Sequence, residues 1–305
     1  MIKFVATRVV AVAITLLAVS ALVFALSRIA GDPRELYLGE FTTQEQWDAW
    51  GRQMGLDRPL VVQYLVWLGK AATGDLGKSL REQRPVTDIV AEKMPATLQL
   101  GLAAFAMAFI LGLLLGVLAA VKRGTVMDYA GRTFAVLGQA TPPFWLGIML
   151  ILLFAVQLQW LPVGRRDGLS SLVLPTITLG WLAVAANMRL VRSSMLEVLD
   201  SEYIKLARAK GVSVRRVIWK HALRNAMIPP LTQAGLTLAA FIAGAVITET
   251  VFAWPGMGRM AVEAVNQNDF PLLVGAVLTI SFLYLAMNFA VDIAYGLIDP
   301  RIRYS

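Results

Sequence analysis

A hexapeptide at residues 74–79, GDLGKS, has spacing that resembles a nucleotide-binding motif. A phosphate-binding loop follows a strand and has the pattern G-x-x-x-x-G-K-[ST], in which glycine amides surround the phosphates. Here Ala72 replaces the first glycine, and no strand pattern comes before it. We therefore predict a turn at Gly74 and Gly77, and no nucleotide site in this chain.

Hydrolytic and metal-dependent chemistry also lack the necessary residues. His221 is the single histidine and there is no cysteine, which excludes a His-containing metal cluster, a conventional catalytic triad and a disulfide. The HExxH, GxSxG and paired-carboxylate patterns are absent. We predict no catalytic residue, no metal and no bound cofactor, and a contact role for His221 within a basic segment.

Two acidic residues lie inside long apolar stretches. An ionised side chain at the centre of a bilayer costs at least about 2.5 kcal/mol, so each needs a partner or a function. Glu249 and Asp292 are predicted near opposite faces of the membrane, whereas ion-coupled carriers bury such groups near the midplane. We favour interhelical hydrogen bonding for both residues, and an ion site stays the alternative. Gly112 and Gly116 form a GxxxG pair that predicts close helix packing.

A basic segment between two apolar stretches, EYIKLARAKG at 202–211, has the features of a short capped helix. Its residues have high helix propensity, and Gly211 suits the left-handed conformation that ends a helix. A stripe of small apolar residues recurs at three- and four-residue spacing: Ile204, Ala207, Gly211, Val214 and Ile218. Small residues let another surface approach closely, whereas a helix on the membrane surface would carry bulkier side chains. We predict docking to a protein, with contact to anionic lipid as the alternative.

The elements that position these residues are predicted to be membrane helices. Of the 305 residues, 57% are hydrophobic and 16% are charged, against about 25% charged in soluble domains. The net charge of +8 comes largely from basic residues beside apolar stretches, which is typical of membrane topology. A soluble DNA-binding protein is therefore excluded, and no nucleic-acid partner is expected. The N-terminal apolar run is long enough to span a bilayer, so we interpret it as a retained first helix.

Six stretches are long and apolar enough to cross a membrane, which predicts an all-α polytopic fold. Their predicted limits are Val9–Ala30, Ala96–Val121, Thr133–Gln157, Leu172–Leu190, Met227–Val251 and Pro271–Ile298. Prolines lie in or beside the third and fourth stretches, where neighbouring groups can satisfy the freed carbonyls.

Clusters of Lys and Arg predict the orientation of the chain. With six crossings, four clusters fall on one side: those at 3–8, 122–132, 189–224 and 301–303. The positive-inside rule makes that side cytoplasmic, so both termini are predicted inside, and the long, mixed-charge segment 31–95 is exempt from the rule. The predicted parts are a cytoplasmic N-terminus with the first helix (1–30), an extracytoplasmic segment (31–95), a core of five helices (96–298) and a cytoplasmic tail (299–305). A cytoplasmic loop (191–228) lies within the core. The extracytoplasmic segment contains aromatic residues and both charge signs, so we expect it to fold.

The sequence resembles, through nearly its whole length, the dipeptide, oligopeptide and nickel subfamily of ABC-importer permeases. ARAKG at 207–211, followed by VSVRRVIWKHALRNAMIPP, is similar to that family's coupling loop. The general importer motif is Glu-Ala-Ala, three residues, then Gly; Ala207 and Gly211 match it, while Lys205 and Leu206 depart from it as the peptide-permease form does. Further similar segments are GDP at 31–33, GDLGKS at 74–79, TPPFWLG at 141–147, WLPVG at 160–164, ETVFAWPGMGRM at 249–260 and DPRIRY at 299–304. The long segment after the first helix resembles the B-type subunit.

The resemblance implies a type I ABC importer permease fold in a bacterial inner membrane. It implies a heterodimer with a second homologous permease, two ATP-binding subunits that use ATP and Mg²⁺, and an extracytoplasmic substrate-binding protein. The implied ATPase-coupling residues are Glu202, Tyr203, Lys205, Ala207, Arg208, Ala209, Lys210, Gly211, Arg215 and His221. The residues implied at an outer gate or in contact with the binding protein are Glu249, Trp254, Pro255, Gly256, Asp269 and Phe270.

The implied substrate is a dipeptide or oligopeptide. Nickel, glutathione or another small solute is the alternative within the same family. An ion-coupled secondary carrier is the alternative from another class, and it would transport without ATPase subunits.

Overall fold

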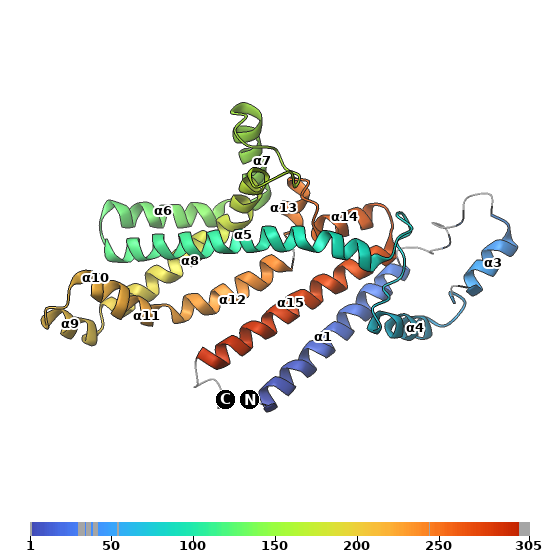
Figure 1. Ribbon diagram of the computed structural model, residues 1–305, viewed down its shortest axis with the longest axis horizontal. Helices are drawn as coiled ribbons and strands as arrows, with labels where there is room; N and C mark the ends of the chain where they lie inside the picture. Colours follow the sequence, from blue (N-terminus) through green and yellow to red (C-terminus); the bar gives the residue numbers. More distant parts are fainter. Residues whose placement is uncertain are drawn as a thin grey trace.

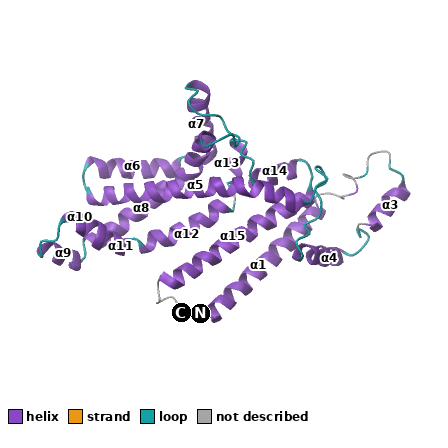
Figure 2. Ribbon diagram, in the orientation of Figure 1, coloured by secondary structure: helices purple, strands orange, loops and turns teal. Residues whose placement is uncertain are grey.

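The computed structural model describes residues 2–29, 34, 38, 42–53, 55–243 and 245–298, and within these ranges the chain is helical with no strand (Figures 1 and 2). The helices in chain order are α1 (Ile2–Ile29), α3 (Gln44–Gln53), α4 (Leu60–Ala72), α5 (Val86–Val121), α6 (Val126–Ala140), α7 (Pro143–Leu150), the π-helical η1 (Ile151–Gln157), α8 (Ser170–Leu199), α9 (Glu202–Ala209), α10 (Val214–Arg216), the π-helical η2 (Val217–Ala222), α11 (Leu223–Ala226), α12 (Ile228–Ile242), α13 (Val246–Val251), α14 (Met257–Asn266) and α15 (Phe270–Ile298). The predicted tail at 299–305 and the GDP segment at 31–33 lie outside the described residues.

Four of the described helices, α1, α5, α8 and α15, have the length and hydropathy needed to cross a membrane. A fifth crossing is present if α6 and the α7–η1 helix together form one bent span. α12 has only 15 residues, fewer than the roughly 20 that a helix needs to cross a bilayer. The count of six crossings and the cytoplasmic side of the termini therefore stay predictions.

The third predicted stretch, Thr133–Gln157, is wrong as a single helix. α6 ends at Ala140, α7 begins at Pro143, and the two helix axes are bent by 103°. Proline lacks the N–H that a helix needs and forces the residue before it into an extended conformation. Pro142, which precedes Pro143, accordingly has φ −64° and ψ 133°.

The second and fifth predicted stretches also differ from the helices. Met227–Val251 is split into α12 and α13, because Ala245 leaves the helical region with φ −92° and ψ 55°. α5 starts at Val86, directly after Pro85, which is earlier than the predicted start at Ala96. The helix continues through Pro95, as membrane helices tolerate when neighbouring elements satisfy the freed carbonyl.

Close packing of α5 against α8 forms the centre of the fold, and the GxxxG pair makes it possible. A Cβ on Gly112 would lie 2.6 Å from the Asn187 Cβ, and a Cβ on Gly116 would lie 2.6 Å from the Val191 Cβ. Only glycine allows this approach, so the predicted packing role of the pair is confirmed.

The two ends of the molecule have different elements. Figure 1 shows α3, α4 and α14 towards one end, and α9, α10 and α11 at the opposite end. The first turns of α1 and the last turns of α15 lie side by side, and the Arg8 Nε is 3.1 Å from the Asp292 Oδ2 (Figure 1). Asp292 is thus in an interhelical contact, the reading favoured for it. The helices α3 and α4 show that the segment after the first helix folds, as expected.

Candidate functional site

α9 is a short capped helix, as predicted. Ser201 precedes it in an extended conformation, and Glu202 places a negative charge in its first turn, where the helix dipole favours one. Gly211 has φ +77°, and its N–H donates to the Arg208 carbonyl at 2.9 Å. The next N–H, from Val212, donates to the Ala207 carbonyl at 3.2 Å. A left-handed glycine with these bonds ends the helix without strain.

One face of α9 is buried in the protein's own core. Ile204 is fully buried and belongs to a cluster that includes Val117 of α5 and Met195 of α8. The Asn225 Nδ2 of α11 donates to the Tyr203 hydroxyl at 2.7 Å. Burying an isoleucine side chain contributes roughly 1.5–3 kcal/mol. α9 is therefore attached to α5, α8 and α11, and a displacement of α9 must move or strain them.

The predicted stripe of small apolar residues is wrong as a single docking face. Ile204 is buried and Ile218 packs against the same cluster, whereas Gly211 and Val214 are exposed. The regular spacing was counted across Gly211, but the chain turns there, and α9 and α10 are separate helices. The stripe is thus divided between the core and the surface.

The exposed face of this segment carries large apolar side chains instead. Tyr203, Leu206, Val214 and Trp219 are 44%, 56%, 70% and 48% exposed. We call these four residues the docking face. Sequence reasoning missed Leu206 and Trp219 as surface residues, although Leu206 lies about 200° around the helix from the buried Ile204, at 100° per residue. Exposed apolar residues beside cations mark protein or membrane contacts, and bulky side chains are also those expected of a helix on lipid. Docking to a protein therefore stays a prediction, with contact to anionic lipid as its alternative.

The predicted coupling residues lie together around the docking face. Glu202 and Lys205 form an exposed ion pair, with the Lys205 Nζ 2.8 Å from the Glu202 Oε1. The other exposed members of the set are Arg208, Ala209, Lys210, Gly211 and Arg215, and the half-buried members are Ala207 and His221. Their contact with an ATPase subunit stays a prediction.

A buried ion pair ties the α5–α6 turn to α8 near this segment. The Asp128 carboxylate is buried and accepts from the Arg192 Nε at 2.6 Å and Nη2 at 3.0 Å. The Gly124 N–H also donates to Asp128, at 3.1 Å. A bidentate Arg–carboxylate pair fixes both distance and orientation. The α5–α6 turn is thereby held against α8, which carries α9 at its end.

At the other end, Glu249 is fully buried and joins three elements. Its Oε1 accepts from the Thr97 hydroxyl of α5 at 2.8 Å, and its Oε2 accepts from the Arg259 N–H of α14 at 2.9 Å. Thr97 in turn accepts from the Met257 N–H at 2.8 Å. A carboxylate at the first N–H groups of α14 satisfies donors that the helix cannot satisfy itself. The favoured reading of Glu249, interhelical hydrogen bonding, is confirmed.

Asp269 forms a second buried junction. Its Oδ2 accepts from the Ser79 hydroxyl at 2.5 Å, and its Oδ1 accepts from the Leu272 N–H at 3.2 Å. Gly74 and Gly77 have φ of +88° and +87°, so the turn predicted for GDLGKS is confirmed. Ser79 is thus used to join this turn to the start of α15.

The predicted outer residues lie at two junctions, around Glu249 and around Asp269, and four of the six are buried. Glu249, Trp254 and Asp269 are fully buried, and the Trp254 Nε1 donates to the Ala96 carbonyl at 2.8 Å. Gly256 is buried against the Glu249 carboxylate, while Pro255 and Phe270 are half-buried. Direct contact with a binding protein does not fit the three buried side chains in this conformation, because neighbouring elements cover them. A role of these residues at an outer gate stays a prediction.

The comparisons with known proteins agree with this architecture. Residues 112–304 match the family described as binding-protein-dependent transport system inner membrane component, and residues 1–101 match the N-terminal family of the same membrane component. The di/tripeptide transport system permease protein DppB of Pseudomonas aeruginosa is 41% identical over 100% of this chain and 99% of its own length. The glutathione transport system permease protein GsiC of Escherichia coli O6:H1 is 39% identical over 100% of both chains.

A solved structure shares the fold. An inward-facing conformation of the MetNI methionine ABC transporter superposes with a TM-score of 0.56 and 20% identity, over 69% of this chain and 96% of the other.

This chain belongs to the family of binding-protein-dependent transport system inner membrane components. It is a multi-pass protein of the cytoplasmic membrane with an ABC importer permease fold.

Proposed function

We propose that this chain is one of two permease subunits of an ATP-driven importer of short peptides. Separate ATP-binding subunits dock on the docking face, a second homologous permease completes the pathway, and an extracytoplasmic binding protein delivers the substrate. ATP and Mg²⁺ act on the ATP-binding subunits. The observation that carries the proposal is the docking face itself: exposed apolar residues on α9, α10 and η2, next to the face of α9 that is anchored in the core of α5 and α8.

The geometry supports a lever. Closure of the ATP-binding subunits moves α9, and Ile204 transmits the movement to the helices around it because it packs between them. The Asp128–Arg192 pair carries the same movement to the α5–α6 turn. Packed cores respond to such a displacement by changing between discrete arrangements, since they are not continuously deformable.

The substrate class rests on the relatives. The 41% identity with a di/tripeptide permease over the full length favours short peptides, and the 39% identity with a glutathione permease makes glutathione the second candidate. Competition between labelled dipeptide and glutathione for uptake separates the two.

Uptake by proteoliposomes tests the function. Vesicles that contain the complete assembly with enclosed ATP should accumulate labelled dipeptide only when the binding protein is outside. Vesicles that contain this chain alone should not accumulate it under a proton or sodium gradient. Gradient-driven uptake by the chain alone would instead establish an ion-coupled carrier.

A further inference from the structure

Three cavities meet at Trp67, in the region between α1, α4 and the start of α15. The basic cavity, about 300 Å³, is lined by Arg28, Arg52, Arg58 and Lys70 among others. The central cavity, about 190 Å³, is mostly apolar. The apolar groove, about 320 Å³, runs between α1 and α15.

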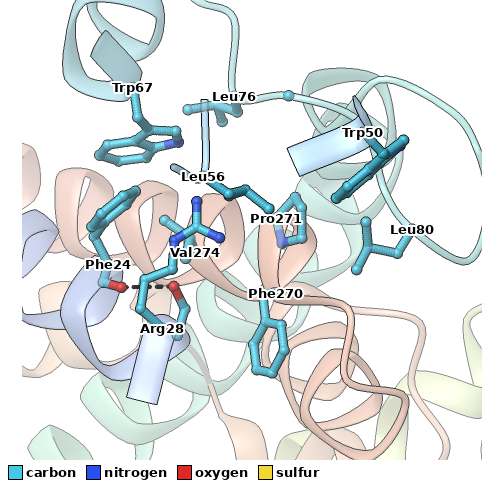
Figure 3. A pocket seen from close by; sticks show the side chains of 12 residues that line it. Phe24, Arg28, Trp50, Leu56, Trp67, Leu76, Leu80, Phe270, Pro271 and Val274 are labelled. Atoms are coloured by element: carbon cyan, nitrogen blue, oxygen red, sulfur yellow. Dashed lines mark hydrogen bonds between the residues drawn. The ribbon is translucent and has the colours of Figure 1, made fainter. Parts of the chain in front are cut away.

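The central cavity shares lining residues with the other two. Figure 3 shows Phe24 and Trp67 on one side of it and Trp50 and Leu80 on the other, with the Arg28 side chain between the two sides. Arg28 and Trp67 also line the basic cavity, and Trp67 also lines the apolar groove. The three cavities are therefore adjacent to one another around Trp67.

The basic cavity has an excess of positive charge. Within the part of the chain that the structure describes, the side chains of Arg52, Arg58 and Lys70 form no ion pair. Asp75 is the one acidic residue that lines the cavity among the described residues, and its Oδ1 already accepts from the Gly77 N–H at 2.9 Å. Arg52, Arg58 and Lys70 thus outnumber Asp75 in this cavity. A net positive charge favours an anionic ligand, and guanidinium groups suit phosphate in particular.

The apolar groove lies beside the middle of the membrane-spanning part of α1, Ala6–Ile29. Leu16 and Leu17 of α1 face Leu278 and Phe282 of α15 across it. Arg28, which lines the basic cavity, follows Leu16 of the groove by twelve positions, a rise of about 18 Å along α1. Half of a hydrocarbon core is about 15 Å thick. Trp67 lies where the groove meets the basic cavity, which is the depth that tryptophan prefers in membranes.

We propose that an anionic phospholipid binds here, with its headgroup phosphate in the basic cavity and an acyl chain in the apolar groove. The lipid joins α4 to α1 and α15, and so attaches the folded outer segment to the membrane helices. A free phosphate shares the headgroup chemistry but leaves the groove empty. This site is separate from the docking face and does not depend on the proposed transport function.

Native mass spectrometry of the full-length chain in mild detergent tests the site, with phosphatidylglycerol, phosphatidylethanolamine or inorganic phosphate added. The R52Q/R58Q double variant should lower the affinity for phosphatidylglycerol about tenfold, because each basic residue near a membrane surface adds to the attraction for anionic lipid. The matched control is K78Q/R81Q, which removes the same charge from the same end of the protein outside all three cavities. The variant Ala71→Phe fills the groove and should weaken lipid binding with every cation in place.

Preference for phosphatidylglycerol over phosphatidylethanolamine, lost in R52Q/R58Q and kept in K78Q/R81Q, supports the site. Equal losses in the two double variants would contradict it, as would equal binding of the two lipids. Displacement of phosphatidylglycerol by inorganic phosphate, or unchanged lipid binding by Ala71→Phe, would show a site for a soluble anion instead. Circular dichroism of each variant confirms that the chain is folded.

Discussion

At the scale of single residues, Glu249 shows how one buried carboxylate can hold several helices together. It joins α5 and α14 from a short helix between two membrane elements. Its main side-chain partner, Thr97, is 152 residues earlier in the chain. The sequence indicates only that a charge in this place needs a partner, because a contact over such a separation depends on the tertiary fold. The sequence therefore predicted that Glu249 forms an interhelical hydrogen bond, but it did not predict that Thr97 is the partner.

Removal of the Glu249 side chain should destabilise the protein. Glu249→Ala leaves the Thr97 hydroxyl and the Arg259 N–H without their acceptor, and each unsatisfied buried group costs about 1–3 kcal/mol. The melting temperature in detergent should fall by about 5 °C or more. The control is Glu263→Ala, which removes an exposed carboxylate that pairs with Arg259 and should change stability by at most about 1 kcal/mol. Equal melting temperatures of the two variants would refute the structural role of Glu249.

At the scale of elements, α9 has two faces with separate roles. Ile204→Ala should lower the melting temperature, because a buried isoleucine reduced to alanine costs roughly 2–5 kcal/mol. Leu206→Ala should leave the melting temperature unchanged and weaken binding of the ATP-binding subunit about tenfold, as expected of an exposed apolar contact residue. Co-purification and thermal melting of both variants separate the two effects. Unchanged subunit binding in Leu206→Ala would argue against the docking face.

Substitution of glycine by alanine should destabilise the protein at the α5–α8 interface but not in the exposed part of α4. Gly116→Ala places a Cβ 2.8 Å from the Met188 carbonyl oxygen, and overpacking of this kind costs about 1–3 kcal/mol. Gly69→Ala in α4 meets nothing within 4 Å and should stabilise the helix by up to about 1 kcal/mol. Melting temperatures should therefore fall for the first variant and rise or stay constant for the second. A stable Gly116→Ala protein would show that the helices can separate.

The elements also show which structural features are predictable from sequence. The end of α9 at Gly211 and the close packing at Gly112 depend on local conformation or on glycine itself, and both were predicted correctly. The break between α6 and α7 was missed, because apolar composition continues across Pro142 and masks the change in backbone direction. The buried side of α9 was assigned wrongly, since periodicity does not tell which face meets the protein's own core.

At the scale of the whole molecule, the two ends are built for different tasks. One end has an exposed apolar and cationic face on a helix anchored to α5 and α8. The other end is held by buried carboxylates and has the proposed lipid site beside them. α5 and α8 extend between the ends (Figure 1), so we predict that a displacement at α9 is transmitted to the outer residues through these packed helices.

The most direct test of this coupling measures peptide uptake and ATP hydrolysis together in proteoliposomes of the complete assembly that contains Gly211→Arg. Gly211 has φ +77° with open space around it, so a bulky side chain disturbs the helix end and the docking surface without a clash inside the chain. Gly74→Arg is the control, because that glycine has a similar φ of +88° and open space, but lies on the outer segment. We expect Gly211→Arg to abolish both substrate-stimulated hydrolysis and uptake, while Gly74→Arg keeps them. Unaltered hydrolysis and uptake in Gly211→Arg would contradict the role of α9 in coupling.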